Sequence, residues 1–184
     1  MEGATLTLYP VFYTTYEEFR NQYPQGLLLH KPSKGKAGSY YESYFADKTK
    51  LGIFGRIDNF KRLGAKEVVF GLKLNGKKVA ITKALLKEYR YKIIESIHDA
   101  VLVYFDHKTN TAMAYSLTGL NYPSTADFTV SDSTITLGSR NWSWDLKNGQ
   151  SHAAETPALA RIPVTTAFWF AWVSFFPETE LIRE

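Results

Sequence analysis

VVFGLKLNGKKVAI, residues 68–81, is the stretch of sequence that decides the fold. Two apolar runs flank Asn75 and Gly76, a pair that tolerates the positive φ angles of a two-residue hairpin turn. Pairing outward from this turn gives the hairpin one apolar face, because side chains alternate between the two faces of a strand. The predicted cross-strand pairs are Leu74 with Lys77, Leu72 with Val79 and Phe70 with Ile81. The stretch therefore predicts an antiparallel hairpin that lies on a core.

Two more pairs of short apolar runs, each joined by a polar turn, predict further antiparallel hairpins. The pairs are AVLVYF (100–105) with TAMAYSL (111–117), and DFTV (127–130) with TITL (134–137) around Ser131 and Asp132. After them, NWSWDLKNGQ puts Trp142, Trp144 and Leu146 on one face before a second Asn-Gly turn at Asn148 and Gly149. Strands thus dominate the second half of the chain.

Helices are few and short in this interpretation. TKALLKEYR, residues 82–90, has room for one short helix, with Thr82 as the side chain that caps its first turn. A chain of 184 residues with 45% hydrophobic residues is long enough to close one core. We therefore expect a single domain, residues 1–184, of the α+β class. It is β-dominated, with antiparallel hairpins forming a sheet or partly open barrel and short peripheral helices.

Composition excludes several kinds of chemistry. The chain has no cysteine, which removes disulfides, thiolate zinc ligands and cysteine nucleophiles. Basic residues gather in the first half and acidic residues in the second. We interpret the lysines as an exposed sheet face that resists edge-to-edge pairing, and no zinc-finger, helix-turn-helix or RNA-binding pattern predicts a nucleic-acid partner. The N-terminus lacks the charged start and apolar run of a signal peptide, so we expect none in this chain.

A repeat relates the two ends of the chain. YPVFYTTYEEFRNQYPQGLLL, residues 9–29, lies over IPVTTAFWFAWVSFFPETELI, residues 162–182, at an offset of 153 positions. Each copy contains a proline, threonines able to cap a helix, a helical run, a second proline and an apolar strand. The matched residues are Pro10 with Pro163, Val11 with Val164, Pro24 with Pro177, Leu28 with Leu181, Phe19 with Trp172 and Tyr23 with Phe176. We therefore predict a repeated helix-strand element.

The helices of the two copies differ in what they expose. The first keeps Tyr16, Phe19 and Tyr23 on one stripe, the pattern of a half-buried surface helix. The second is apolar on all sides except at Ser174, and its apolar run is about half of the ~20 residues that a membrane span needs. Such a helix lies deep in the core or is covered by a partner protein. The predicted partner-interface residues are Phe168, Trp169, Trp172 and Phe176.

Residues suited to catalysis do not form a pattern. His98 and Asp99 are mirrored by Asp106 and His107, but a strand between them separates the pairs by roughly 26–30 Å at ~3.3 Å per residue, too far for one metal ion. The nucleophile elbow, the phosphate-binding loop and the Rossmann glycine fingerprint are absent. We predict no catalytic residue, no metal and no cofactor, and the balance favours a chain that is not an enzyme.

Aromatic side chains give an alternative to a protein interface. Tyr41, Tyr44, Trp142 and Trp144 have rings that could stack on a sugar or another flat ligand. This alternative describes a small-ligand domain, for a sugar-like molecule or a metal, or a degenerate half of an enzyme. It predicts a concave pocket, whereas a protein interface predicts an uncovered apolar patch and self-association.

Five stretches along the chain form a recognisable set, namely TTYEEFRNQYPQGLLL, SYYESYF, RLGAKEVVFGLKLNGKKVAI, SWDLKNG and FWFAWVSFFPETEL. Together they resemble the family of domain of unknown function 3179. The chain resembles the C-terminal half of longer members, which look like tandem half-domains. These carry a tryptophan-histidine-glutamate stretch and a Cys-Pro-Leu-Cys-Gly motif that this chain lacks. The resemblance implies an exported protein in a periplasmic, cell-envelope or extracellular setting, and it implies no established activity.

We therefore expect a non-catalytic interaction or assembly module of an exported or envelope-associated protein. It would bind a protein partner or a second copy of itself. We favour this hypothesis over ligand binding because the chain keeps the packing motifs of the family and lacks its chemically capable ones.

Overall fold

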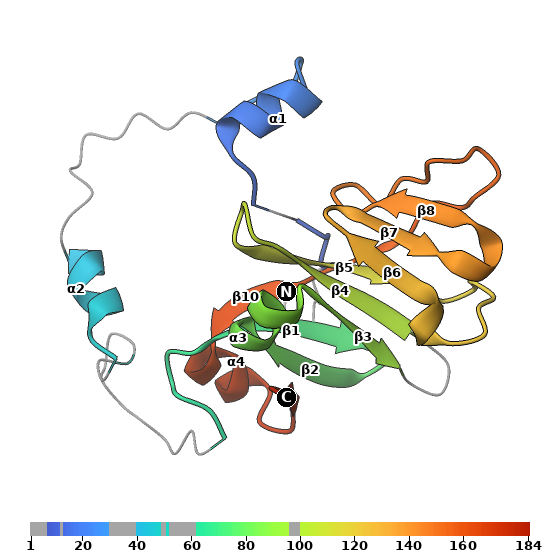
Figure 1. Ribbon diagram of the computed structural model, residues 1–184. Coiled ribbons are helices and arrows are strands. Elements are labelled where there is room, and N and C mark those ends of the chain that lie inside the picture. Colours follow the sequence, from blue (N-terminus) through green and yellow to red (C-terminus); the bar gives the residue numbers. More distant parts are fainter. Residues whose placement is uncertain (1–6, 12, 30–39, 49–50, 52–61, 96–99) are drawn as a thin grey trace.

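A computed structural model describes residues 7–11, 13–29, 40–48, 51, 62–95 and 100–184, and for Tyr40 and Tyr41 the backbone alone. The described part contains eleven strands in three sheets and four short α-helices (Figure 1). The ladders are antiparallel with one exception, and the sheets do not close into a barrel. The β-dominated class with antiparallel hairpins and short helices is confirmed.

The first sheet, sheet A, is built around the hairpin of residues 68–81. Its strands in spatial order are β10 (Thr165–Phe168), β1 (Val68–Leu74), β2 (Lys77–Thr82) and β11 (Glu180–Ile182). All three predicted cross-strand pairs between β1 and β2 are confirmed. Asn75 and Gly76 have φ angles of 45° and 82°, the positive values that the hairpin turn requires. β11 pairs with β2 in the parallel direction.

Sheet B lies in the middle of the molecule. Its strands in spatial order are β3 (Tyr91–Glu95), β4 (Ala100–Asp106), β5 (Thr111–Ser116) and β9 (Arg161–Ile162). The predicted β4–β5 hairpin is confirmed. Leu102 and Tyr104 belong to the apolar cluster shared with sheet C, and Val101 and Val103 belong to the cluster shared with sheet A. Both faces of β4 are therefore buried, which explains its nearly continuous apolar sequence.

Sheet C forms the outer layer. Its strands are β6 (Phe128–Ser131), β7 (Thr134–Leu137) and β8 (Trp142–Asp145), and two single-turn 3-10 helices, Thr125–Asp127 and Gly138–Arg140, precede β6 and β8. Ser131 pairs with Thr134, so the turn lies at Asp132 and Ser133, one residue later than the sequence predicts. Trp144 packs against sheet B as part of their common cluster.

The α-helices are all seven residues long and lie outside the sheets. They are α1 (Tyr16–Gln22), α2 (Tyr40–Ala46), α3 (Lys83–Tyr89) and α4 (Trp169–Phe175). The cap predicted for α3 is confirmed, because the Thr82 hydroxyl accepts a hydrogen bond from the Leu85 amide at 3.3 Å. Residues 30–39, which the sequence marks as a polar loop, lie outside the described residues.

Helix α4 covers the face of sheet A that points away from sheet B. Trp169 and Trp172 are 1% and 3% exposed and pack on Val69 of β1 and Ala80 of β2. A Cβ atom built on Gly71 would lie 2.2 Å from the Trp172 ring, so the indole rests on bare backbone. The Trp172 indole N–H donates to the Thr179 hydroxyl at 3.0 Å. The layers thus run in the order α4, sheet A, sheet B and sheet C.

The first turn of α4 is satisfied by the segment before β1. No side chain caps this turn, but the Trp169 and Phe170 amides donate to backbone carbonyls of that segment, those of Glu67 and Ala65, at 2.8 and 2.9 Å. These bonds replace the cap that the N-terminus of a helix requires. Beyond the helix, the Arg62 guanidinium of the same segment donates to the Thr179 carbonyl at 2.7 Å.

We expect Gly71→Ala to lower the free energy of unfolding by about 1–3 kcal/mol, because the added methyl group overlaps the buried Trp172 indole. Chemical denaturation of the purified protein measures the change. Gly64→Ala is the matched control, since a Cβ there meets only the side chain of exposed Glu67 at 3.1 Å. Equal stability of the two variants would contradict the packing of α4 on sheet A.

Candidate functional site

The N-terminal segment carries most of the exposed apolar surface. We call residues 7–29 the N-terminal element. Among the described residues, the large hydrophobic side chains that are exposed in this element are Leu8, Tyr9, Val11, Tyr13, Tyr16, Tyr23, Leu27, Leu28 and Leu29. Elsewhere only Phe45, Tyr89 and Phe175 belong to this class in the described part. Leu27 and Leu29 are 95% and 101% exposed, which is costly in water and typical of a surface that another molecule covers.

This element has the same local structure as the C-terminal segment that holds α4. Helices α1 and α4 begin and end 153 positions apart. The residues after them, Tyr23 and Phe176, have nearly equal backbone angles, with φ −130° and ψ 74° in one and φ −134° and ψ 69° in the other. The same turn follows each helix, because the Gly26 amide donates a hydrogen bond to the Tyr23 carbonyl and the Thr179 amide donates one to the Phe176 carbonyl.

The surroundings of the two segments differ. The C-terminal one contributes strands β9, β10 and β11 to sheets A and B and buries two tryptophans. The N-terminal element forms no ladder with a described strand, and α1 has no buried residue.

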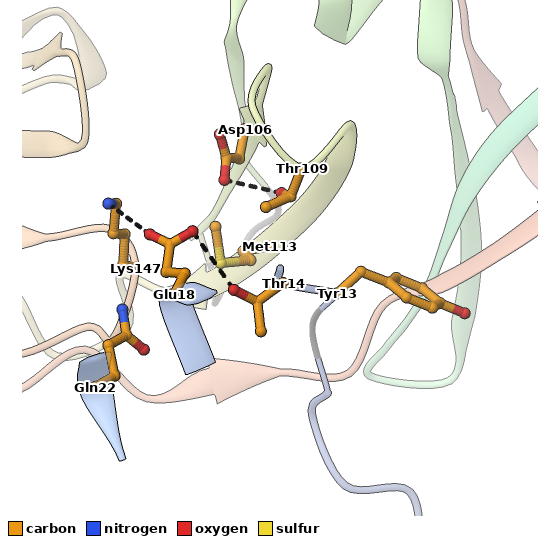
Figure 2. A pocket seen from close by; sticks show the side chains of 8 residues that line it. All are labelled: Tyr13, Thr14, Glu18, Gln22, Asp106, Thr109, Met113 and Lys147. Carbon is orange, nitrogen blue, oxygen red and sulfur yellow. Dashed lines mark hydrogen bonds and ion pairs between the residues drawn. The ribbon is translucent and has the colours of Figure 1, made fainter. Parts of the chain in front are cut away.

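One ion-pair cluster holds α1 against the rest of the chain (Figure 2). The Glu18 carboxylate accepts a hydrogen bond from Lys147 Nζ at 2.9 Å and lies 3.6 Å from Lys108 Nζ. Thr14 Oγ1 donates to the same carboxylate at 3.5 Å. Beside it, Asp106 accepts a hydrogen bond from Thr109 Oγ1 at 2.8 Å, at the turn that joins β4 and β5. We call the contact of Glu18 with Lys147 and Lys108 the latch.

The charges of the latch shift the titration of its members. The hydrogen bond from Lys147, with smaller contributions from the charges of both lysines, lowers the pKa of Glu18 below its usual value, although partial burial acts in the opposite direction. The same hydrogen bond raises the pKa of Lys147. The latch is therefore intact at neutral pH, and it is lost in acid when Glu18 is protonated.

The predicted interface residues lie largely inside the chain's own structure. Trp169 and Trp172 are buried against sheet A, and Phe176 packs on the same cluster. Phe168 is half-buried and its ring lies 5.9 Å from that of Phe45. On α4, Phe175 is 80% exposed. Sheet A thus covers most of the aromatic surface that the sequence suggested for a partner.

The predicted ligand residues do not converge on one pocket. Trp144 is 0% exposed, and its indole N–H donates to the Pro157 carbonyl at 2.7 Å, so no ligand reaches its ring in this structure. Trp142 is half-buried, with its ring 6.1 Å from that of Trp144 and 5.0 Å from the Arg140 guanidinium. Tyr44 is on α2, and the Tyr41 side chain lies outside the described residues. A stacking role for Trp142 and Tyr44 stays a prediction.

A cavity that the sequence did not predict lies beside α3. Its volume is about 550 Å³, within the roughly 300–1,000 Å³ of small-molecule sites. Phe45 and Phe168 supply an aromatic wall, and Glu67 is the acidic residue of the lining. The basic lining residues are Lys48, Lys66, Lys83 and Lys87. The lysines come from separate segments, so no local sequence motif predicted the cavity.

The lysines of this cavity differ in their contacts. Lys66 Nζ donates to the Tyr44 and Asp47 carbonyls at the end of α2 and lies 3.8 Å from the Tyr44 ring centroid. These backbone carbonyls hold the Lys66 ammonium at the end of α2. Within the described part, no carboxylate lies at ion-pair distance from Lys48, Lys83 or Lys87. Their charges are available to an anion.

The described residues contain neither a metal-binding cluster nor a membrane-spanning helix. The described histidines, His107 and His152, are exposed, whereas His30 and His98 lie outside the description. No group of three or more histidine, aspartate or glutamate side chains in the described ranges is placed to hold a metal ion. None of the described helices combines the length and apolar character needed to cross a membrane.

The fold and the exposed element define a β-protein of three stacked sheets with a short helical segment, α1, outside them. A family model described as protein of unknown function, DUF3179, matches residues 1–179, so the chain belongs to this family. No curated protein and no solved structure matches the chain. Correspondence to the C-terminal half of longer members stays a prediction.

We expect Glu18→Gln to release α1, because the neutral amide loses the charge attraction to Lys147 and Lys108. An isolated seven-residue helix is unstable in water, so released α1 unfolds. Trypsin cleavage after Arg20 should become about two- to fivefold faster, the factor that a surface pair worth roughly 0.5–1 kcal/mol supplies.

The unchanged chain should also release α1 in acid. The lowered pKa of Glu18 means that the latch is fully present above its unperturbed value of 4.5 and is lost as the pH falls through the lowered pKa. Hydrogen exchange of residues 16–22 follows this at pH values where trypsin does not work. Glu17→Gln is the matched control, and an equal effect of that variant would contradict the latch.

Proposed function

We propose that the chain is a non-catalytic interaction module and that its N-terminal element binds a protein partner. The observation that carries the proposal is the exposure of this element's leucines and tyrosines, whereas the corresponding C-terminal segment buries its two tryptophans. An element that is folded locally and has no sheet to join is suited to joining one on another molecule. An exported or envelope setting for this module, which the family resemblance implies, stays a prediction.

The internal repeat supports this proposal. If residues 9–29 and 162–182 are two copies of one helix-strand element, both need a surface that covers their apolar side. Sheets A and B supply that surface for the second copy. The first copy is held by the latch, a polar contact that leaves its apolar side chains uncovered. The partner would therefore cover the apolar side of the first copy, as sheets A and B cover that of the second.

We expect the purified chain to associate as its concentration rises, so that light scattering gives a mass above 20.9 kDa. The double variant Leu27→Asp/Leu29→Asp should remain at the monomer mass, because charged side chains at these positions resist burial. Phe175→Asp on α4 is the matched control and should associate like the unchanged chain. A chain that stays monomeric at all concentrations would overturn self-association through this element.

The cavity beside α3 favours a second candidate function, the binding of a small organic anion. Three lysines that have no carboxylate partner among the described residues raise the local positive potential, and Phe45 and Phe168 offer an apolar wall to a ring or short chain. The sequence predicts a sugar-like or metal ligand. The basic lining of the cavity instead favours an anionic ligand.

Phenyl phosphate and the neutral phenyl β-glucoside distinguish these ligands by calorimetry. We expect the phosphate to bind and the glucoside to fail, because only the phosphate has charge to match the lysines. Lys83→Met/Lys87→Met should weaken phosphate binding at least tenfold, whereas Lys77→Met, in the β1–β2 turn region outside the cavity, should leave it unchanged. Tighter binding of the glucoside would instead favour a sugar-like ligand.

A further inference from the structure

We propose that the N-terminal element takes, on a second domain of this fold, the place that α4 and β11 take on their own domain. This inference rests on the proposed function, because it names the partner of that interaction surface. It identifies the partner by the shape and hydrogen-bonding groups of one particular site, namely the outer face of sheet A together with the edge of strand β2.

The site is defined by what the C-terminal segment contacts. On the face of sheet A, the Trp172 ring rests on Gly71, where any side chain would collide with it. At the edge, β11 forms a parallel ladder with β2, in which Leu181 pairs with Ala80 and Ile182 with Ile81. A molecule that occupies this site therefore needs an aromatic helix face, a turn, and a strand of three residues.

The N-terminal element supplies these parts with the same spacing. At the offset of 153 positions, Tyr16 and Phe19 stand for Trp169 and Trp172 on the helix. Leu27, Leu28 and Leu29 stand for β11, and they form no ladder with a described strand. Their backbone groups can therefore pair with the edge of β2 on another domain, and their side chains lose contact with water when they do.

Two lysines beside this site could contact the N-terminal element as they contact the C-terminal segment. Lys73 and Lys78 place their ammonium groups 4.9 and 5.9 Å from the ring centroid of Phe176. Tyr23 occupies the corresponding position in the N-terminal element, so the two lysines would meet an aromatic ring in either case. Several positions depart from the pattern, since Glu17 and Glu18 stand for half-buried Phe170 and Ala171, and Arg20 stands for half-buried Val173. The long aliphatic stem of Arg20 can cover apolar surface while the guanidinium remains in water.

In the unchanged chain, two features limit the replacement of the resident α4 and β11 by the N-terminal element of another copy. The resident α4 and β11 are joined to their own sheet by a short connection, which gives them a high effective concentration at the site. The latch also keeps α1 on its own domain. A domain whose resident element is weakened is therefore the better acceptor, and a second copy of this chain can be made into one by substitution.

Cross-linking between two engineered copies tests the inference, because the chain has no cysteine of its own. The donor carries Tyr23→Cys. The acceptor carries Lys73→Cys together with Trp172→Ala, which removes the indole that rests on Gly71. A flexible bismaleimide should join positions 23 and 73, identified by mass spectrometry of the linked peptides, with a yield at least fivefold higher than for an acceptor that keeps Trp172.

Controls separate the specific complex from general association. A donor that also carries Leu28→Asp should lose the link, and a donor with Tyr89→Cys, at the exposed end of α3, should not form it. Where Trp172→Ala prevents folding of the acceptor, Thr179→Ala removes the hydrogen bond of the indole and serves in its place. Absence of the 23–73 link, or a link that Leu28→Asp leaves unchanged, overturns the inference.

The result is distinguishable from failure of the proposed function. Association that Leu27→Asp/Leu29→Asp abolishes, without a 23–73 link, would retain the interaction surface and reject this partner. A 23–73 link on the weakened acceptor, with the unchanged chain monomeric at 20.9 kDa, would retain the partner and reject self-association of the native chain.

Discussion

Burial of both faces of strand β4 is the constraint on which the other layers depend. Ala100, Leu102 and Tyr104 point to sheet C, while the residues between them point to sheet A. Each outer sheet therefore has one face committed to sheet B. The second face of sheet A needs a separate cover, and α4 provides it with two tryptophans on Val69 and Ala80. The order of the layers follows because each apolar sheet face must be covered by another element.

Local features of this structure could be predicted from the sequence because they depend on neighbouring residues. The Asn75–Gly76 turn fixes the register of β1 with β2, and Thr82 caps α3 through a residue three positions away. The stacking of the sheets could not be predicted in this way. It depends on contacts between distant segments, such as the parallel pairing of β11 with β2, for which no turn residue gives a signal.

Hydrophobicity alone did not determine how exposed the two helices are. The apolar sequence of α4 left burial in the core and cover by a partner as alternatives, and sheet A buries its tryptophans. Helix α1 looked half-buried, but Tyr16 and Tyr23 are exposed. The sequence of an element shows how much apolar surface it has to bury. Whether that surface is buried depends on whether a sheet face or strand edge lies nearby. Helices α1 and α4 have the same length and similar backbone angles at the residue that follows them, yet their surroundings differ.

The candidate sites were predictable to different degrees for the same reason. Trp144 was proposed as a ligand residue because tryptophan has a large ring, but the alternation of β8 turns it toward sheet B. The lysine cavity combines residues from positions 48 to 87 and depends on where α2 lies. Glu18 and Lys147 are 129 positions apart, so neither could be assigned a partner before the fold was known.

Sheet A also closes late along the chain, since Val68 of β1 pairs with Phe168 of β10. The β1–β2 hairpin leaves the ribosome about 100 residues before its cover does, an interval of about 5–20 s at roughly 5–20 residues per second. During this time the bare strip around Gly71 and Val69 faces the surroundings of the nascent chain. Non-local closure of this kind slows folding and exposes strand edges to aggregation. The production of this protein in a cell therefore depends on what shields that strip until translation reaches the C-terminal strand.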